Sequence, residues 1–230
     1  MKKYSIIIPI HNEVNHIPIL LKALRYFSND GNEIIIIDDG SNDGTKEILD
    51  KNTDFIIESN KINMGKGAAI IKGFKLASNE NIILMDGDLE IDIDDLPNII
   101  LEYEKDQSDV LTGVRWGIQS SKQIYNVNMI GNLIINSIFN FLYKSNFRDV
   151  LCCVKILSSK NFKSLNIQSQ RFSIEVETMA KLVLNKSKIK EVYVQYKRRT
   201  NEEGKKLKLS DGWSILKTMI EINYKNNKKL

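Results

Sequence analysis

Two aspartates separated by one glycine, Asp86 and Asp88, are the residues whose types and spacing most clearly suggest chemistry. They follow the apolar run 81–85, and if extended geometry continues, their side chains point the same way, because side chains alternate along a strand. Two carboxylates on one side suit a hard divalent cation that also binds phosphate oxygens. Gly87 would let a ligand approach the backbone, and Glu90 repeats the two-residue spacing. Such a pattern is common in surface turns, so its place in the fold decides its value.

Polar and small residues also follow three other apolar runs, in segments 11–13, 38–44 and 113–115. Ligands of parallel sheets bind at the carboxyl ends of the strands. We therefore expect these segments and the two aspartates to line one cleft. An acidic residue such as Asp39 can accept hydrogen bonds from a ribose or a base. The alternative is a tight turn in which Ser41, Asn42 or Asp43 caps the next helix.

Strands and helices alternate in the first half of the chain, which predicts right-handed βαβ units and a parallel α/β sheet. Isoleucine runs such as 34–37 predict strands buried on both faces. We expect strands at 4–10, 33–37, 55–57, 81–85 and 110–113, and helices at 14–27, 43–50, 65–77 and 95–104. Later elements are helices at 125–143 and 175–184, strands after Asp149 and at 189–196, a basic loop at 197–208 and a final helix near 211.

Two of these helices carry stripes with two possible interpretations. The asparagine stripe at 125–143 is either the polar outer face of a core helix or part of an amphipathic helix beside the site or at a membrane surface. Its members are Asn128, Asn132, Asn136 and Asn140. The final helix carries the apolar stripe Trp213, Leu216, Ile220 and Tyr224. Core packing is the default interpretation there, and membrane docking, helped by the lysines at 225, 228 and 229, is the alternative.

The 230 residues are 42% hydrophobic and 27% charged, which suits a folded α/β domain and excludes disorder by composition. The formal net charge is +4, but residues 181–230 hold 14 Lys and Arg against 5 Asp and Glu. This imbalance suits an anionic partner, namely a phosphorylated ligand, an acidic membrane surface or nucleic acid, or else reflects solvated lysines. The two cysteines, Cys152 and Cys153, are adjacent, which favours a reducing, cytoplasmic setting.

Several classes of function are disfavoured. No run approaches the roughly 18 apolar residues of a membrane span, and the N-terminus reads as a strand rather than a signal peptide, so we expect any membrane contact to be peripheral. Segment 63–67 lacks the spacing of an NTPase phosphate loop. His11 and His16 cannot complete a zinc site with the adjacent cysteines. The basic loop is not interleaved with aromatic residues, which disfavours nucleic-acid binding.

Eight short motifs occur in order between Tyr4 and Gly212. They are Pro9-Ile10-His11-Asn12-Glu13, Asp38-Asp39-Gly40-Ser41, Asn63-x-Gly65-Lys66-Gly67, Asp86-x-Asp88-Leu89-Glu90, Gly113-Val114-Arg115, Asp149-x-x-Cys152-Cys153-x-Lys155, Arg171-Phe172-x-x-Glu175-x-Glu177 and Arg199-Thr200-Asn201-Glu202-Glu203-Gly204. Together they resemble family-two glycosyltransferases of the polyprenyl- and dolichyl-phosphate sugar synthase branch. The resemblance implies a GT-A fold in 1–212, a Rossmann-like, mostly parallel sheet flanked by helices, followed by an amphipathic helix and basic tail in 213–230.

The resemblance also implies roles for individual residues. Those that would hold the base and ribose are Pro9, His11, Glu13, Ile37 and Asp39. The diphosphate would bind at Asp86, Gly87 and Asp88, and Mg²⁺ or Mn²⁺ at Asp86, Asp88 and Glu90, where relatives often have Gln. Arg115, with Arg199 or Lys205 from the basic loop, would neutralise phosphate. The basic loop itself is interpreted either as a lid over the donor phosphates or as a flexible charged surface loop. The implied catalytic residues are Asp88, Arg115, Asp149 and Glu175.

The implied reaction is inverting transfer of a sugar from a GDP- or UDP-sugar to a polyprenyl or dolichyl phosphate at the cytoplasmic face of a membrane. The alternative acceptor is a hydroxyl of a capsule or surface polysaccharide. That acceptor needs a general base, for which the sequence offers Asp149, Glu175 and Glu177. A binding module without turnover is less favoured, because Asp86, Asp88 and Arg115 are all present. A nucleotidyltransferase is less favoured, because segment 11–13 lacks the Gly-rich signature that such enzymes usually have after the first strand. The sequence leaves the oligomeric state open.

Overall fold

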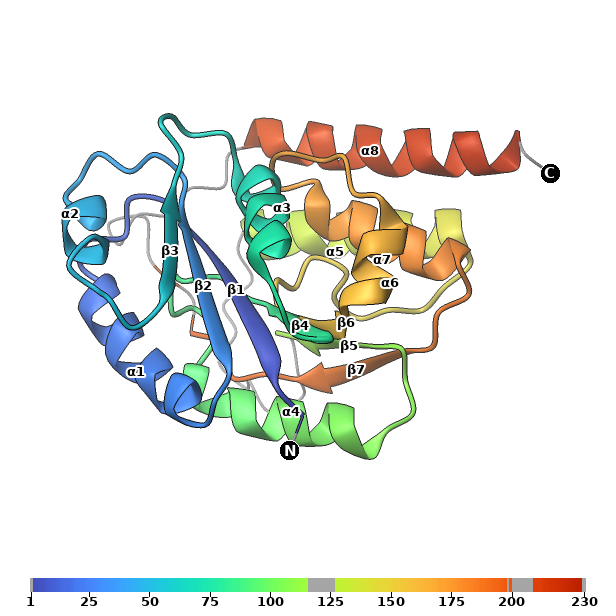
Figure 1. Cartoon of the computed structure of the whole chain (residues 1–230). Helices are drawn as coiled ribbons and strands as arrows, with labels where there is room; N and C mark the ends of the chain where they lie inside the picture. The colour runs from blue at the N-terminus through green and yellow to red at the C-terminus, as the bar shows by residue number, and fades with distance from the viewer. Residues whose placement is uncertain (1, 116–126, 198, 200–208, 229–230) are drawn as a thin grey trace.

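The computed structural model describes residues 2–115, 127–197, 199 and 209–228, and within them seven strands form one sheet (Figure 1). The spatial order is β3-β2-β1-β4-β6-β5-β7. The strands are β1 (Tyr4–Ile10), β2 (Glu33–Asp38), β3 (Ile56–Ser59), β4 (Asn81–Leu84), β5 (Val110–Val114), β6 (Lys155–Ser158) and β7 (Ile189–Tyr193). The expected strands are all present, with ends shifted by up to three residues.

One strand of the seven runs against the others. β1 pairs in parallel with β2 and β4, β2 with β3, and β5 with β7. β6 lies between β4 and β5 and is antiparallel to both. The carboxyl ends of the other strands therefore lie at one edge of the sheet. The mostly parallel α/β sheet predicted from the sequence is confirmed.

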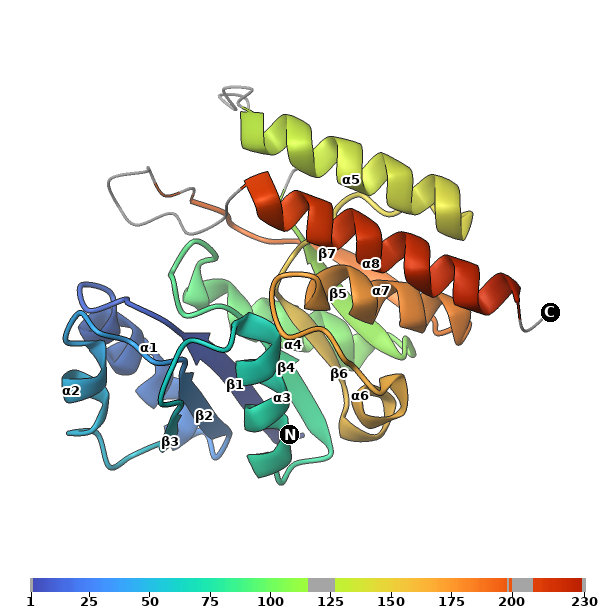
Figure 2. The same cartoon turned by 90° about the horizontal axis from the view of Figure 1, so that it is seen from above.

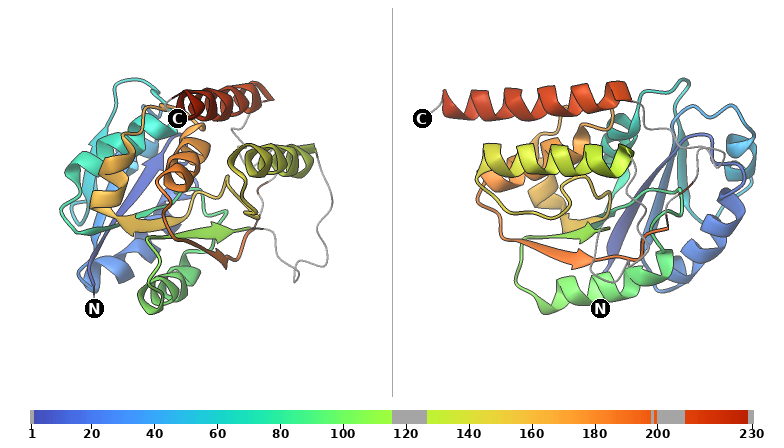
Figure 3. Two further views of the ribbon diagram at one scale, coloured as in Figure 1. Left: turned by 90° about the vertical axis from the view of Figure 1, so that its right-hand side faces the viewer. Right: turned by 180° about the vertical axis from the view of Figure 1, so that it is seen from behind.

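Helices cover both faces of the sheet (Figure 3). One face carries α1 (Ile17–Asn29), α2 (Thr45–Leu49), the short 3₁₀ turn η1 (Ile93–Asp95) and α4 (Leu96–Lys105). The other carries α3 (Lys66–Leu76), α5 (Val127–Tyr143), α6 (Ser159–Leu165), α7 (Ile174–Leu184) and α8 (Leu209–Asn227). Isoleucines of β2 alternate between these two layers: Ile34 and Ile36 pack against the first, and Ile35 and Ile37 against the second. This burial on both faces is what the isoleucine run predicted.

Two members of the asparagine stripe of α5, Asn136 and Asn140, face inward, so the interpretation of the stripe as a polar outer face is wrong. Asn136 and Asn140 each donate a side-chain hydrogen bond to the carbonyl oxygen of Phe147, at 2.7 and 2.8 Å. The amide oxygen of Asn136 accepts from the Val150 amide at 3.0 Å, and that of Asn140 accepts from the Phe147 amide at 3.0 Å. These two asparagines therefore fix the chain segment 147–150, and the exposed residues described on the outward face of α5 are apolar except Ser137.

Most of the apolar stripe predicted on α8 is exposed and not packed in the core. Trp213, Ile220 and Tyr224 are 77%, 55% and 58% exposed, whereas Ile215 and Met219 are the buried residues of this helix. α8 packs on α7 and lies beside α5 (Figure 2). The expected boundary between residues 212 and 213 falls inside α8. Among the described helices, none has a stretch long and apolar enough to cross a membrane.

Candidate functional site

The segments that follow β1, β2 and β4 meet at the carboxyl edge of the sheet. The Asn12 amide donates to the Ser41 hydroxyl at 2.8 Å, which ties the first segment to the second. The Glu13 amide donates to Thr45 Oγ1, also at 2.8 Å. Glu13 in turn shares a guanidinium partner, Arg199, with Asp88 of the third segment. Three of the four segments predicted to line one cleft, those after β1, β2 and β4, therefore lie together.

Asp86 is held by a lysine at the first residue of α3. Lys66 Nζ lies 2.7 Å from Asp86 Oδ1 and 2.6 Å from Glu175 Oε1. Glu175 also pairs through Oε2 with Lys155 Nζ, which donates to the Cys152 carbonyl as well. Two lysines and two carboxylates thus form one continuous chain of ion pairs from β6 to Asp86.

Burial governs the protonation of this chain of ion pairs. The Lys155 side chain is fully buried and that of Glu175 is 9% exposed. Burial alone would raise the pKa of Glu175, but the charges of Lys155 and Lys66 outweigh it and lower the pKa below its usual value. Burial alone would lower the pKa of Lys66, but Asp86 and Glu175 hold it well above its usual value. Lys66 and Glu175 therefore favour their charged forms, whereas burial raises the pKa of Asp86 despite its lysine partner.

Asp88 lies in a second, more acidic cluster. Arg199 contacts Glu13 through both terminal nitrogens, at 2.7 and 3.0 Å, and reaches Asp88 Oδ2 at 3.3 Å. Glu90 accepts from the Tyr196 hydroxyl at 3.2 Å and from the Arg199 amide at 3.1 Å. Burial, with the nearby charge of Glu90, raises the pKa of Asp88, and Arg199 only partly offsets this.

The described part of the second cluster has more carboxylates than guanidinium groups, which favours binding of a divalent cation. The described part of the second cluster sets one guanidinium, that of Arg199, against the carboxylates of Glu13, Asp88 and Glu90. No group of three or more His, Cys, Asp or Glu side chains within the described residues is arranged to hold a metal by itself. Mg²⁺ and similar ions are commonly bound by one or two carboxylates together with substrate phosphates. The oxygen donors of Asp86 and Asp88 fit an ion held in that way.

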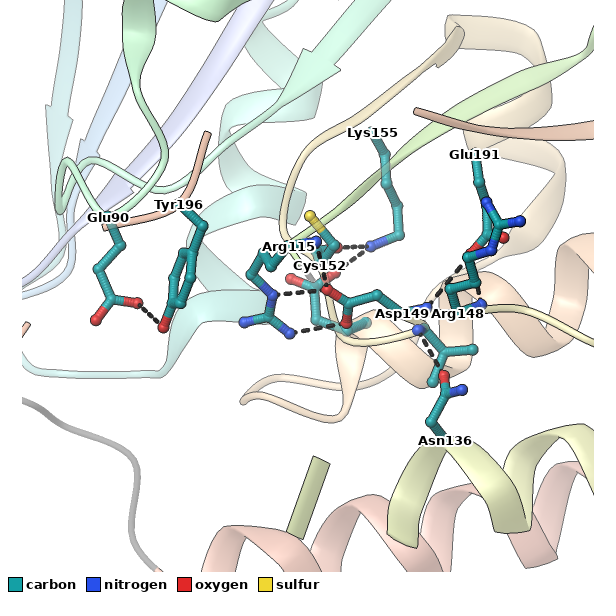
Figure 4. Close-up of polar contacts among 11 residues, drawn as sticks. Glu90, Arg115, Asn136, Arg148, Asp149, Cys152, Lys155, Glu191 and Tyr196 are labelled. Carbon is teal, nitrogen blue, oxygen red and sulfur yellow. Dashed lines mark hydrogen bonds and ion pairs between the residues drawn. The ribbon is translucent and has the colours of Figure 1, made fainter. Parts of the chain in front are cut away.

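Arg115 is fixed on the other side of β6 by Asp149 (Figure 4). Arg115 Nε and Nη2 donate to the two carboxylate oxygens at 2.8 and 2.9 Å, and the Arg115 amide adds a bond of 3.1 Å. The Asp149 side chain is 2% exposed. Burial alone would lower the pKa of Arg115, but Asp149 holds it well above its usual value. The bidentate geometry orients the guanidinium as well as keeping it charged.

The segment that carries Asp149 is itself held from two directions (Figure 4). Glu191 of β7 accepts from the Arg148 and Asp149 amides at 2.7 and 3.3 Å. Asn136 of α5 accepts from the Val150 amide on the opposite side. The Arg115 guanidinium also lies 5.7 Å from the centre of the Tyr196 ring, within cation–π range. Arg115 is thus positioned by elements far apart in the sequence.

The residues expected to hold the nucleotide lie around the ends of β1 and β2. Asp39 is 3% exposed, and its carboxylate accepts from Asn60 Nδ2 and from the Met64 and Gly65 amides at 2.6 to 2.9 Å. Ile37 is fully buried against α3, so only its backbone can reach a ligand. Glu13 is 6% exposed and belongs to the Arg199 cluster. Pro9 and His11 are partly exposed at the end of β1.

The glycine between the aspartates is favoured by packing. A Cβ atom at Gly87 would lie 2.0 Å from Ile10 Cδ1 and 2.9 Å from Ile8 Cγ2. Apolar packing therefore favours glycine there, and its role in letting a ligand approach the backbone stays a prediction. Strand geometry also ends before the triplet, at Leu84. Asp86 and Asp88 accordingly meet different cations, Lys66 and Arg199.

The sequence predicted no site role for two lysines of the ion-pair chain, Lys66 and Lys155, and one expected residue lies outside the described chain. The Gly-Lys-Gly setting of Lys66 lacks the spacing of an NTPase phosphate loop and does not by itself indicate an ion pair with Asp86. A lysine inside an apolar run, such as Lys155 before Ile156 and Leu157, was the available signal of a buried charge. Lys205, and most of the basic loop expected as a lid, lie outside the residues that the structure describes.

Comparison with known proteins places these features in a family. Residues 5–165 match the family described as Glycosyl transferase family 2. An uncharacterized protein of Methanocaldococcus jannaschii is 30% identical over 204 residues, which cover 82% of this chain and 85% of that protein. The undecaprenyl-phosphate 4-deoxy-4-formamido-L-arabinose transferase of Pectobacterium atrosepticum is 33% identical over 130 residues. That match covers 53% of this chain and only 39% of the transferase.

A solved structure shares the whole fold. Glucosyl-3-phosphoglycerate synthase from Mycobacterium tuberculosis, in complex with Mn²⁺, uridine-diphosphate and phosphoglyceric acid, aligns with a TM-score of 0.75. The alignment covers 96% of this chain and 78% of that chain at 16% identity. At this identity the likeness establishes the fold, which is the GT-A fold expected from the motifs.

Proposed function

Since this chain belongs to glycosyl transferase family 2 and is a glycosyltransferase, we propose that it moves a sugar from a nucleoside-diphosphate sugar to the phosphate of a polyprenyl-type lipid. The proposed donor is a GDP- or UDP-sugar, and the proposed transfer is a single, inverting displacement at the anomeric carbon. A similar protein named for an undecaprenyl-phosphate acceptor and a similar fold in complex with Mn²⁺ and uridine-diphosphate support these choices.

The donor would lie along the carboxyl edge of the sheet, with its nucleoside over the ends of β1 and β2. Pro9, His11, Glu13 and Asp39 are the residues proposed to contact base and ribose, together with the backbone of Ile37. The diphosphate would then reach the Asp86–Asp88 segment. Mg²⁺ or Mn²⁺ held by Asp86 and Asp88, with Glu90 nearby, would neutralise charge on the departing nucleoside diphosphate.

The cations of this chain would share that work. Arg115 is oriented by Asp149 and would supply a fixed positive charge, the kind of preorganised group that stabilises charge developing in a transition state. Lys66 is anchored by Glu175 and stands beside Asp86. Arg199 would exchange its carboxylate partners for donor phosphate. Lys205 would add a further charge from the basic loop.

One observation carries the choice of a phosphate acceptor. A hydroxyl acceptor needs a general base, but each carboxylate that the sequence offered for that role is already bound. Both oxygens of Asp149 accept from Arg115, and those of Glu175 pair with Lys66 and Lys155. Glu177 accepts from the Gln168 and Ser169 amides at 3.0 and 2.6 Å. We therefore give Asp149 and Glu175 positioning roles. A lipid phosphate is already ionised near neutral pH and attacks without a strong base.

A screen of GDP- and UDP-sugars with Mg²⁺ or Mn²⁺ and a short-chain polyprenyl phosphate tests the proposal. We expect nucleoside diphosphate release that requires both the metal and the lipid, and loss of that release in Asp88→Asn. Release that requires an oligosaccharide hydroxyl instead of the lipid would favour the alternative acceptor. A chain that binds no donor under any of these conditions would contradict the proposed site.

A further inference from the structure

α5 is a surface helix without any charged residue. Its 17 residues contain no Asp, Glu, Lys or Arg. Helices on the outside of a soluble domain normally turn charged and polar residues to water. Among the α5 side chains that the structure describes, the exposed ones are apolar except Ser137: Ile130, Leu133, Ile134 and Phe141 are 48%, 42%, 53% and 84% exposed. The opposite side of α5 is occupied by the core and by segment 147–150.

α8 extends this apolar surface. Tyr143 donates a hydrogen bond to the Met219 carbonyl, and Asn223 donates to the Leu142 carbonyl, so this side of α8 contacts α5. At about 100° per residue, Ile220 and then Trp213 and Tyr224 follow next around the helix. We call the seven exposed residues Ile130, Leu133, Ile134, Phe141, Trp213, Ile220 and Tyr224 the α5–α8 face. They are seven of the fifteen large hydrophobic residues that the described chain exposes, gathered on two neighbouring helices.

Charged residues beside this face are mostly basic. Lys217, Lys225 and Lys228 are exposed along α8, and Lys228 Nζ lies 4.6 Å from the centre of the Tyr224 ring. The exposed acidic residue on the outer side of α8, Glu221, lies 3.8 Å from Lys217. Tryptophan, tyrosine and lysine around an apolar strip are the composition of surfaces that lie in the headgroup region of a bilayer.

We propose that the α5–α8 face docks on the surface of a lipid bilayer that carries anionic headgroups. The apolar side chains enter the boundary between headgroups and acyl chains, and the lysines of α8 contact lipid phosphates. Both helices begin after segments that follow site arginines, α5 after Arg115 and 116–126, and α8 after Arg199 and 200–208. Docking would thus bring the site to a lipid phosphate, a consequence that rests on the proposed function.

Flotation with vesicles tests the face without any acceptor present. The vesicles contain either phosphatidylcholine alone or phosphatidylcholine with phosphatidylglycerol, and no polyprenyl phosphate. We expect the full chain to bind the anionic vesicles and to bind the neutral ones more weakly. The double variant Ile134→Ser/Phe141→Ser should bind at least about tenfold more weakly, since two apolar side chains no longer enter the bilayer. Each Lys→Gln change at 217, 225 or 228 should weaken anionic binding by about fivefold.

A matched control comes from α1 on the other side of the sheet, where Ile19 and Tyr26 are 61% and 62% exposed. Ile19→Ser/Tyr26→Ser should bind the vesicles like the unmodified chain. Equal binding by the two double variants would overturn the proposal. So would a vesicle-free dimer that Ile134→Ser/Phe141→Ser converts to a monomer, because the face would then be an interface between copies.

Failure of docking is distinguishable from failure of the proposed function. Nucleoside diphosphate release is measured separately, with a short-chain polyprenyl phosphate that is soluble without vesicles. Release with that acceptor but no vesicle binding would overturn the docking face and leave the function intact. Vesicle binding without release on any lipid phosphate would support the face and overturn the acceptor.

Discussion

Replacing Glu175 by glutamine should show that this carboxylate holds the site together electrostatically. The substitution keeps the shape of the side chain but removes the negative charge between Lys66 and Lys155. Within the described residues, Lys155 then keeps only the Cys152 carbonyl as a partner while remaining fully buried. A buried charge that loses its counter-charge typically costs about 3–5 kcal/mol of stability. For a domain of this size the cost corresponds to a fall in Tm of roughly 6–20 °C.

A double-mutant cycle separates this effect from ordinary loss of packing. Lys155→Met alone should also destabilise, because Glu175 then loses one of its two described lysine partners and keeps Lys66. In Glu175→Gln/Lys155→Met the unpaired lysine is gone, so the loss should be smaller than the sum of the two single losses by about 2 kcal/mol or more. Urea unfolding of the four proteins at pH 7 gives these free energies. Additive losses within about 0.5 kcal/mol, or a Glu175→Gln protein as stable as the unmodified one, would refute the reasoning.

Three further predictions concern other parts of the site. Asp88→Asn should raise Tm by a few degrees in metal-free solution, because burial and Glu90 raise the pKa of Asp88. It should also abolish the upward Tm shift that we expect Mn²⁺ with a nucleoside diphosphate to give the unmodified chain. An unchanged shift would contradict the metal site. Burial alone would raise the pKa of Glu177, but hydrogen bonds from Lys181, Ser169 and Gln168 outweigh it and lower the pKa below 4.5. The stability that ionised Glu177 contributes is therefore present above pH 4.5 and is lost as the pH falls through the lowered pKa. Glu177→Gln should therefore have a lower urea midpoint than the unmodified chain at pH 7, and the difference should be smaller at pH 3. A difference that is the same at both pH values would contradict the lowered pKa of Glu177. Asn136→Ala frees the Val150 amide and removes one of the two side-chain donors to the Phe147 carbonyl. It should lower kcat by about tenfold through Arg115 with little change in donor KM; an equal effect on both would indicate general loss of structure.

The sequence predicted the sheet and most of its edge because those features depend on local patterns. Runs such as Ile34 to Ile37 can satisfy their burial only inside a two-faced sheet, and Asp38 and Asp86 follow directly where such runs end. Strand direction is not local, so the reversal of β6 could not be foreseen. The partners of buried charges are not local either. The sequence offers Glu175 as a possible base, whereas the structure pairs its carboxylate with Lys66 and Lys155.

The helical stripes failed for a related reason. Periodicity tells which residues share a face of a helix, but not which face meets the protein. Asn136 and Asn140 point inward because the segment 147–150 has backbone groups that need partners. The opposite face of α5 is left with Ile130 and Phe141. For the same reason the sequence predicted a buried stripe on α8 that includes Trp213 and Ile220, whereas the buried residues of this helix are Ile215 and Met219.

The reversed strand β6 sets the width of the site. Strands in a sheet lie about 4.8 Å apart, so a strand between β4 and β5 separates their ends by roughly 9–10 Å. Asp86 and Asp88 follow β4, and Arg115 follows β5. Direct pairing of β4 with β5 would bring the acidic residues and the arginine close enough to neutralise each other. β6 keeps the two charges apart, so that the proposed diphosphate-sugar donor would bridge the gap instead of a salt bridge.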